Sequence, residues 1–123
     1  MATVLYVDDE EGIRRAVSSW LTRKGHVVHT AGDVASARTL LALESLDVAF
    51  VDLWLGGESG LELQDWVDEH RPEFASHMIF VTGDIAPCEA TTRALHALGR
   101  PVITKPFELA DLESLVRRMG DGG

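Results

Sequence analysis

The stretch Val48-Ala49-Phe50-Val51-Asp52 is apolar without interruption until its last residue. A strand with one solvated face alternates apolar and polar side chains, whereas a continuous apolar run indicates that both faces are covered. Strands of that kind are typical of a parallel sheet with helices on both sides. The runs Val4–Val7, which precedes Asp8, and Met78–Val81, which precedes Thr82, have the same character. We therefore predict three buried parallel strands that each end at a polar side chain.

Segments with helical periodicity separate these strands. From Ile13 to Lys24, apolar residues recur three and four positions apart, which is the stripe of an amphipathic helix, and Gly25 follows as a stop. The pattern Ser59-Gly60-Leu61-Glu62 has the spacing of a capping box and predicts the start of another helix, which ends near Pro72. By similar arguments we expect helices from Asp33 to about Ser45, from Pro87 to about Gly99 and from Leu109 to Met119, and edge strands at His26–Thr30 and Val102–Ile103.

Strands and helices thus alternate five times along the chain. Crossover connections between parallel strands are right-handed, so helices on both faces imply a doubly wound sheet, and its five-stranded form has the order 2-1-3-4-5. The predicted fold class is α/β, a flavodoxin-like (βα)5 sandwich. Residues 1–119 are expected to form one domain and residues 120–123 a flexible tail.

The composition excludes several classes of function. The 123 residues include 11 Lys and Arg and 20 Asp and Glu, for a formal net charge of −9. Such a chain repels nucleic-acid phosphates and anionic membranes, so we expect no direct nucleic-acid binding and no membrane attachment. The single cysteine, Cys88, cannot form an internal disulfide, and the opening MATVLYVDDEE lacks the basic region of a secretory signal. The most apolar segment, Leu40–Leu55, is interrupted by three acidic residues and is too short to span a membrane. We expect a cytoplasmic protein.

The polar residues that follow the strands define the candidate site. In a doubly wound sheet the carboxyl ends of the strands share one edge, and ligands bind beyond it at the switch point between the first and third strands. Three carboxylates at one edge oppose one another's ionisation and call for a cation. Mg²⁺ is the natural choice, because it binds few carboxylates and accepts phosphate oxygens. The residues expected at this edge are Asp8, Asp9, Asp52, Thr82, Gly83 and Lys105.

This set of residues predicts phosphoryl transfer. Asp52 can attack a phosphorus atom in line, while Lys105 holds a phosphoryl oxygen. The Thr82 hydroxyl and the Gly83 amide can donate hydrogen bonds to the same anion. The product is an aspartyl phosphate. Glu10, which continues the first acidic cluster, is interpreted as mainly structural.

Four motifs lie in order at the ends of the predicted strands: VDDE at Val7–Glu10, VDLWLGGESG at Val51–Gly60, VTGD at Val81–Asp84 and TKPF at Thr104–Phe107. Together they resemble the receiver domain of two-component response regulators, as in chemotaxis regulators, and the resemblance extends from residue 3 to about residue 119. It implies a phosphoprotein that acts as a signalling switch rather than as an enzyme. Such a domain promotes its own phosphorylation and dephosphorylation.

The resemblance also implies a set of metal-binding residues. Asp52 looks like the phosphoacceptor, and Asp9 and Asp8 look like the acidic pair that binds Mg²⁺, with Asp8 acting through water. The backbone carbonyl of Trp54, two residues past the phosphoacceptor, matches the family's third protein ligand.

The phosphate-binding side of the resemblance includes two departures. Thr82 matches the switch hydroxyl and Lys105 the phosphate-pairing lysine, and the peptide bond before Pro106 is cis in similar domains. Gly56 stands where the family usually has proline, which implies a more mobile loop. Val102 stands where many receivers have an aromatic residue that moves with the switch threonine, which implies a weaker coupling between the two.

Two residues are candidates for control of hydrolysis. Trp54 and Asp84 lie two positions beyond Asp52 and Thr82, at sites that tune hydrolysis in similar domains. We expect the Trp54 indole to shield an acyl phosphate from water. One alternative function is a Mg²⁺-dependent phosphohydrolase, but haloacid-dehalogenase-like phosphatases have a second Asp where Trp54 stands. The other alternative is a phosphorylation-independent interaction module.

The expected partners follow from the resemblance. The phosphoryl donor is a sensor histidine kinase or a histidine phosphotransfer protein, and an unknown output partner binds the face formed by the fourth helix, fifth strand and last helix. The segment LGRPVITKPFELADL is similar to receivers fused to hybrid histidine kinases. The sequence leaves open whether the domain stands alone or belongs to a longer chain, and whether phosphorylation drives homodimerisation.

Overall fold

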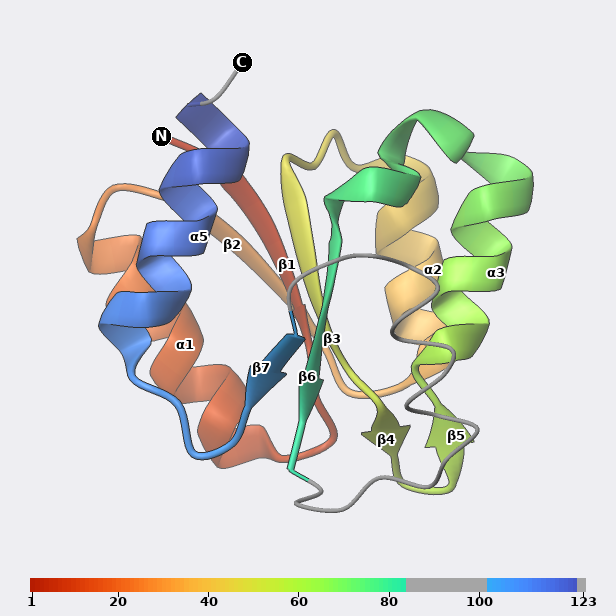
Figure 1. Cartoon of the computed structure of the whole chain (residues 1–123), viewed down its shortest axis with the longest axis horizontal. Coiled ribbons are helices and arrows are strands. Elements are labelled where there is room, and N and C mark those ends of the chain that lie inside the picture. Colours follow the sequence, from red (N-terminus) through yellow and green to blue (C-terminus); the bar gives the residue numbers. More distant parts are fainter. Residues whose placement is uncertain (84–101, 122–123) are drawn as a thin grey trace.

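The computed structural model describes residues 1–83 and 102–121, which form a five-stranded parallel sheet with helices on both faces (Figure 1). The order across the sheet is β2-β1-β3-β6-β7, and every neighbouring pair is parallel. Counted along the chain this is the predicted order 2-1-3-4-5, so the α/β fold class is confirmed. The strands are β1 (Thr3–Val7), β2 (Val27–Ala31), β3 (Val48–Asp52), β6 (Met78–Thr82) and β7 (Val102–Thr104).

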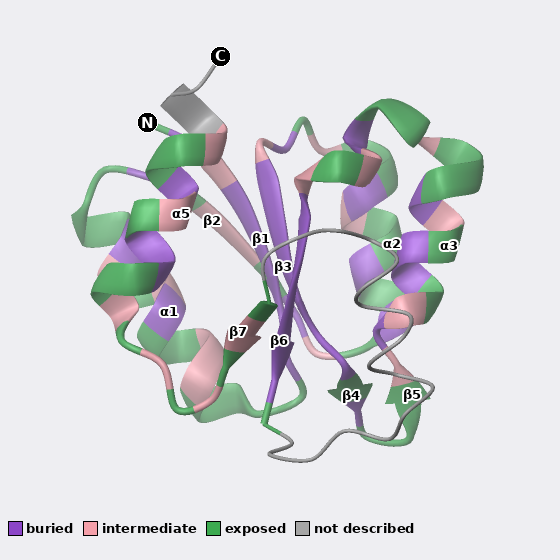
Figure 2. Cartoon of the chain, viewed as in Figure 1, coloured by how far each residue is buried: buried purple, intermediate pink, exposed green. Residues whose placement is uncertain are grey.

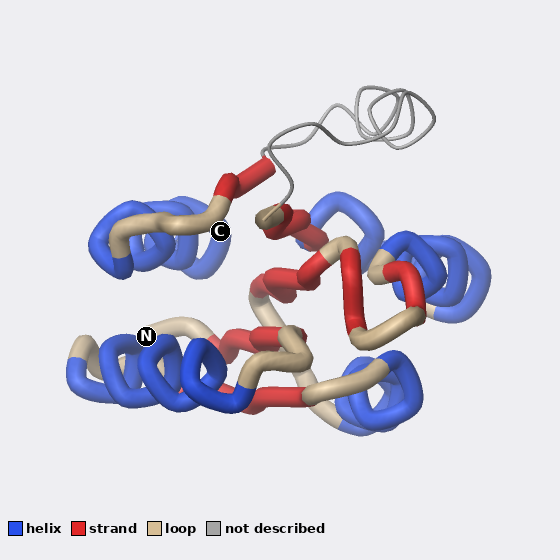
Figure 3. The backbone as a smooth tube through the Cα atoms, turned by 90° about the horizontal axis from the view of Figure 1, so that it is seen from below, coloured by secondary structure: helices blue, strands red, loops and turns tan. Residues whose placement is uncertain are grey.

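In the part of the chain that the structure describes, two pairs of helices cover the faces of the sheet. As Figures 1 and 3 show, α1 (Glu11–Arg23) and α5 (Leu109–Asp121) lie on one face, and α2 (Val34–Leu43) and α3 (Leu61–His70) lie on the other. The helix predicted between residues 87 and 99 lies outside the described residues. Within the described ranges, no helix has the length and apolar character needed to cross a membrane.

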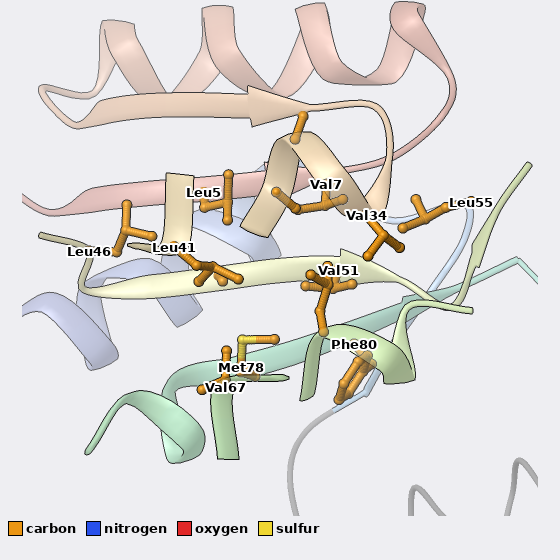
Figure 4. Packing of buried hydrophobic residues seen from close by; sticks show 14 of the residues in the cluster. Leu5, Val7, Val34, Leu41, Leu46, Val51, Leu55, Val67, Met78 and Phe80 are labelled. Atoms are coloured by element: carbon orange, nitrogen blue, oxygen red, sulfur yellow. The ribbon is translucent and has the colours of Figure 1, made fainter. Parts of the chain in front are cut away.

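The central strands separate two hydrophobic cores. β1, β3 and β6 are almost entirely buried, whereas the edge strands β2 and β7 are more exposed (Figure 2). Successive side chains of a strand point to opposite faces, so Leu5 and Val7 pack toward α2 and α3 while Val4 and Tyr6 pack toward α1 and α5. We call these the α2/α3 core, shown in Figure 4, and the α1/α5 core. Burial on both faces explains why the central strands are continuously apolar.

Single residues determine where α1 ends and where α2 begins. Gly25 follows α1 with φ of 91°, a conformation that glycine adopts without the steric penalty of a Cβ atom. Asp33 is the N-cap of α2, and its Oδ1 accepts a hydrogen bond from the Ser36 amide at 2.7 Å. Both predicted signals are confirmed.

The end of α2 lies two residues earlier than the predicted Ser45. The helix ends at Leu43, and the Arg71 Nη1 donates hydrogen bonds to the carbonyl oxygens of Leu41 at 2.6 Å and Glu44 at 3.1 Å. Arg71 precedes η1 (Pro72–His77), a 3-10 helix that connects α3 to β6 and was not predicted. A side chain from a distant segment thus satisfies carbonyl groups that the end of α2 leaves without helical partners.

The capping box predicted at Ser59 does not form. The N-cap of α3 is Gly60, which has no side chain, and the Ser59 Oγ accepts a hydrogen bond from the Leu61 amide at 3.2 Å instead. Ser59 belongs to β5 (Glu58–Ser59), which pairs antiparallel with β4 (Trp54–Leu55). The prediction was wrong because a capping box needs a hydrogen bond from the Glu62 amide, three residues on, whereas the Ser59 hydroxyl binds the amide two residues on.

The loop that contains Gly56 is a hairpin formed by β4 and β5. Its two turn residues, Gly56 and Gly57, have φ of 58° and 101°, which favours glycine at both positions.

At the other end of the chain, α5 continues to Asp121, so Gly120 and Asp121 belong to the helix rather than to the tail predicted for residues 120–123. Backbone hydrogen bonds can extend a helix beyond its last buried side chain. The apolar pattern of the sequence marks only the buried part and therefore does not predict this extension. Residues 122 and 123 lie outside the described residues.

Candidate functional site

The carboxyl edge of the sheet contains an open cleft of about 370 Å³. β3 and β6 end there, at Asp52 and Thr82, and β7 leads into Lys105. The walls combine acidic, basic, aromatic and glycine residues: Asp9, Glu10, Asp52, Trp54, Gly56, Gly57, Gly83 and Lys105. Parallel topology therefore brings residues that are far apart in the sequence to one cavity, at the switch point between β1 and β3.

Lys105 joins the acidic residues of two strands. Its Nζ lies 2.6 Å from Asp52 Oδ2, 2.9 Å from Asp8 Oδ2 and 3.8 Å from Glu10 Oε1. Its backbone amide donates to the Thr82 carbonyl oxygen at 2.8 Å. Burial lowers the pKa of Lys105, but its hydrogen bonds to Asp52 and Asp8 outweigh this effect and raise the pKa above its ordinary value. The side chain is therefore a fixed cation between two carboxylates.

Asp52 presents a desolvated carboxylate at the end of β3. The residue is 5% exposed, its Oδ1 accepts a hydrogen bond from the Trp54 amide at 2.9 Å, and its Oδ2 faces Lys105. Burial raises the pKa of the Asp52 carboxyl above its ordinary value, and the hydrogen bonds from Lys105 and the Trp54 amide offset only part of this effect. A carboxylate with few waters to displace is suited to act as a nucleophile.

Asp8 is more deeply buried than Asp52 and does not line the cleft. Its side chain is 0% exposed. The Tyr6 hydroxyl donates to its Oδ2 at 3.1 Å, and the Glu10 amide donates to its Oδ1 at 3.0 Å. The Arg14 Nη1 donates to its backbone oxygen at 2.8 Å. Burial and the nearby charge of Asp8 raise the pKa of Tyr6, which keeps the phenol protonated as a donor.

The residues present fit a divalent cation. One carboxylate oxygen from each of Asp8, Asp9 and Glu10 lies within 4.8 Å of the others. All of these donors are oxygen atoms, which a hard cation such as Mg²⁺ or Ca²⁺ prefers. Asp52 is connected to this group through Lys105. The acidic cluster therefore has the oxygen donors that a divalent cation needs, and Glu10, interpreted from the sequence as mainly structural, lies beside Asp8 and Asp9 in it.

The remaining predicted site residues are placed as follows. Thr82 is buried at the end of β6, and Gly83 lines the cleft beside Lys105. The Lys105-Pro106 peptide bond is cis, in agreement with the expectation for Pro106. Val102 is 37% exposed on β7. Asp84, the second candidate for control of hydrolysis, lies outside the described residues.

Trp54 lines the same cleft as Asp9, Glu10 and Asp52. It belongs to β4, the residue is 55% exposed, and its backbone amide donates a hydrogen bond to Asp52. A large aromatic ring with that exposure beside a carboxylate is available to a ligand or to solvent.

Sequence reasoning missed two residues that hold Asp8. Tyr6 lies two positions before Asp8, and residues two apart on a strand share a face, so this spacing was a signal for their contact. Arg14 gave no comparable signal, because its contact with the Asp8 carbonyl depends on how α1 packs beside β2, where its guanidinium lies close to Gly32.

Comparison with known proteins identifies relatives that align with nearly the whole chain. A family model described as the response regulator receiver domain matches residues 4–117. Response regulator protein PilR of Pseudomonas aeruginosa is 34% identical over 112 residues, which cover 91% of this chain and 24% of PilR. The probable transcriptional regulatory protein TcrX of Mycobacterium tuberculosis is 33% identical over 122 residues, 96% of this chain and 51% of TcrX. The chain thus spans about a quarter to a half of these relatives.

A solved structure agrees with this assignment. The CheY-like response regulator receiver domain of Methanospirillum hungatei superimposes with a TM-score of 0.84 at 26% identity, covering 99% of this chain and 95% of that one. The family model covers most of the chain, and the relatives align over nearly all of it. The chain belongs to the response regulator receiver domains, the phosphoacceptor switches of two-component systems.

Proposed function

We propose that Asp52 is the phosphoacceptor and receives its phosphoryl group from the phosphohistidine of a sensor histidine kinase or a histidine phosphotransfer protein. The observation that carries this proposal is the contact of Lys105 Nζ with Asp52 Oδ2 at 2.6 Å, at the wall of an open cleft. A nucleophilic carboxylate and a cation for the transferred group are the two parts that phosphoryl transfer to a side chain needs.

The transfer is a displacement at phosphorus. An Asp52 carboxylate oxygen forms a bond to the phosphorus atom while the phosphorus–nitrogen bond of the donor histidine breaks, and the histidine nitrogen keeps the electron pair. Lys105 then holds a phosphoryl oxygen in place of the carboxylate oxygen that it contacts before the reaction. The Thr82 hydroxyl and the Gly83 amide donate hydrogen bonds to the other oxygens.

The cation of this proposal is Mg²⁺. Asp8, Asp9, Asp52 and the backbone carbonyl of Trp54 are the residues that would hold it, and Glu10 lies beside them. When bound, the ion supplies neutralisation of the negative charge that develops on the phosphoryl group. The protein supplies rigidity, because the carboxylates of Asp8 and Asp52 are already fixed by hydrogen bonds.

The output of the switch is a change in partner binding. Phosphorylation moves Thr82 and its loop and thereby alters the face formed by the fourth predicted helix, β7 and α5. Residues 1–119 act as a unit in this proposal, and the domain is a cytoplasmic switch without turnover of small substrates. The output partner and a homodimer formed on phosphorylation are the two binding events to look for.

Intact mass measurement tests the proposal. The protein is incubated with acetyl phosphate and Mg²⁺ beside Asp52→Asn, beside a sample with excess EDTA, and beside Asp47→Asn. Asp47 is a matched control. It lies directly before the first residue of β3, whereas Asp52 is the last residue of that strand, so the two carboxylates lie at opposite edges of the sheet. We expect a labile gain of one phosphoryl group in wild type and Asp47→Asn, and none in Asp52→Asn or with EDTA.

Three results would contradict the proposal. A gain that persists in Asp52→Asn would assign the phosphoryl group to another residue. Steady release of phosphate from small phosphoesters would favour the phosphohydrolase alternative. No gain from acetyl phosphate or from a purified phosphorylated histidine phosphotransfer protein would favour a phosphorylation-independent interaction module.

A further inference from the structure

The buried hydroxyl of Tyr6 is a polar group that the proposed reaction does not use. Tyr6 is 0% exposed and lies on β1, two residues before Asp8 and on the same face of the strand. Its hydroxyl donates to Asp8 Oδ2 at 3.1 Å. The same oxygen lies 2.9 Å from Lys105 Nζ. One carboxylate oxygen thus has two donors, of which one is neutral and fixed by the core and the other is charged and shared with Asp52.

The other polar atoms of Asp8 are also engaged. Its Oδ1 accepts a hydrogen bond from the Glu10 amide, and its backbone amide donates to the Ala31 carbonyl at 3.0 Å. The Arg14 Nη1 contacts its backbone oxygen. The residue is 0% exposed, so water does not reorient its side chain. The orientation of the carboxylate is therefore set by its donors.

Of the two donors to Asp8 Oδ2, only one stays in place during the proposed reaction. Lys105 Nζ also contacts Asp52, and a phosphoryl group on Asp52 draws it toward the new anion. The Tyr6 ring is packed in the α1/α5 core, with its centroid 6.5 Å from that of Phe50, and this packing holds its hydroxyl at Asp8. The hydroxyl of Tyr6 can therefore hold Asp8 both before and after transfer.

We propose that Tyr6 is a positioning residue of the cation site, whose hydroxyl keeps the Asp8 carboxylate in the orientation that binds Mg²⁺ when Lys105 turns to the phosphoryl group. This inference rests on the proposed function. Hydrogen bonds that orient a metal-binding side chain are part of the site, and their loss lowers metal affinity by roughly 10- to 100-fold in known sites.

A comparison of two aromatic substitutions tests the role of the hydroxyl. Tyr6→Phe removes one oxygen atom and keeps the ring in the core. Phe50→Leu is the matched control, because it disturbs the ring beside Tyr6 and leaves the hydroxyl in place. Mg²⁺ is titrated into the full chain. Binding is monitored by tryptophan fluorescence and by the shifts of the amide resonances of Glu10 and Trp54. We expect Mg²⁺ affinity about tenfold weaker in Tyr6→Phe and within twofold of wild type in Phe50→Leu.

The outcomes separate this inference from the function on which it rests. Wild-type affinity in Tyr6→Phe would overturn the positioning role and leave the proposed function intact. Equal weakening in both variants would assign the effect to packing and would overturn the role as well. Absence of Mg²⁺ binding in wild type would remove the cation site and this inference together, while phosphorylation of Asp52 is still decided by the mass measurement.

Discussion

At the residue scale, burial of the charged Asp52 carboxylate lowers the stability of the folded protein. Burial raises the pKa of its carboxyl above the ordinary value of 3.8. Between the unfolded and folded pKa values, the folded state therefore binds more protons than the unfolded chain. The stability contributed by this group falls as the pH rises through that interval and is lowest above it.

Replacement of Asp52 should remove this penalty. We expect Asp52→Asn to raise the urea midpoint of unfolding at pH 7 in EDTA, and the gain to shrink as the pH falls toward about 4. Urea denaturation at both pH values measures the effect. The Asp47→Asn variant should give no such gain, because that side chain accepts a hydrogen bond from the Thr3 amide at the other edge of the sheet. A lower midpoint for Asp52→Asn at pH 7 would show that the pairing with Lys105 outweighs the burial of the charge.

The indole of Trp54 gives a second prediction at this scale. It is 55% exposed in the wall of the cleft, two residues from Asp52. We expect Trp54→Asn to shorten the half-life of the phosphorylated protein severalfold, because the smaller polar side chain admits water to the acyl phosphate. Trp54→Phe should retain most of the half-life. Decay of the phosphorylated mass over time measures both, and an unchanged half-life in Trp54→Asn would show that the indole does not shield the group.

The positions of Asp52, Thr82 and Lys105 could be predicted because topology alone brings the carboxyl ends of parallel strands together. Tertiary packing decides the rest. The two-residue spacing of Tyr6 and Asp8 places both side chains on one side of the chain, but only packing decides that the hydroxyl donates to the carboxylate. The contact of Arg14 with Asp8 depends on the placement of α1. Exposed acidic runs usually are solvated, which is why Glu10 was interpreted as mainly structural although its carboxylate lies close to those of Asp8 and Asp9.

At the scale of elements, the junction between β3 and α3 depends on Gly60. A Cβ atom there would collide with the backbone oxygen of Asp52 and lie 2.8 Å from Val51 Cγ1. The start of α3 is thus in direct contact with the backbone of the proposed phosphoacceptor. We expect Gly60→Ala to destabilise the fold by about 1–3 kcal/mol and to slow phosphorylation, because β3 or α3 has to shift.

Gly12 supplies the control for this variant. It lies in α1, and an added Cβ atom would meet nothing within 4 Å. Gly12→Ala should therefore stabilise the protein by about 0.5–1 kcal/mol, since alanine favours a helix over glycine. Urea denaturation compares the two variants. Equal effects of both substitutions would contradict the close packing at Gly60.

Long periodic elements were predicted more accurately than short ones. The apolar stripe of α1 and the buried run of β3 extend over enough residues to define their own structure. The hairpin of β4 and β5 contains two residues in each strand, and η1 begins at Pro72, which was interpreted only as a stop. Elements of this length have little periodicity of their own and are formed by the contacts around them.

At the scale of the whole molecule, the sheet separates two cores, and these share no side chain among residues 1–83 and 102–121. Val17 of α1 belongs to one and Val67 of α3 to the other, and both are fully buried. We expect Val17→Ala and Val67→Ala each to lower the free energy of unfolding by about 2 kcal/mol. The double variant should lose the sum within about 0.5 kcal/mol. Urea denaturation of the four proteins measures the coupling, and a value above about 1 kcal/mol would mean that the sheet transmits strain between the cores.

The direction of the chain relative to the cleft has a practical consequence. β1 runs from Thr3 toward the cleft, and α5 runs back, so the start of β1 and the end of α5 both lie at the far edge of the molecule (Figure 1). A dye, a bead or a sensor surface attached near either of these points stands away from Asp52. A molecule immobilised in this way presents its reactive edge to the solution, which makes the domain suited to label-based recording of single phosphorylation events.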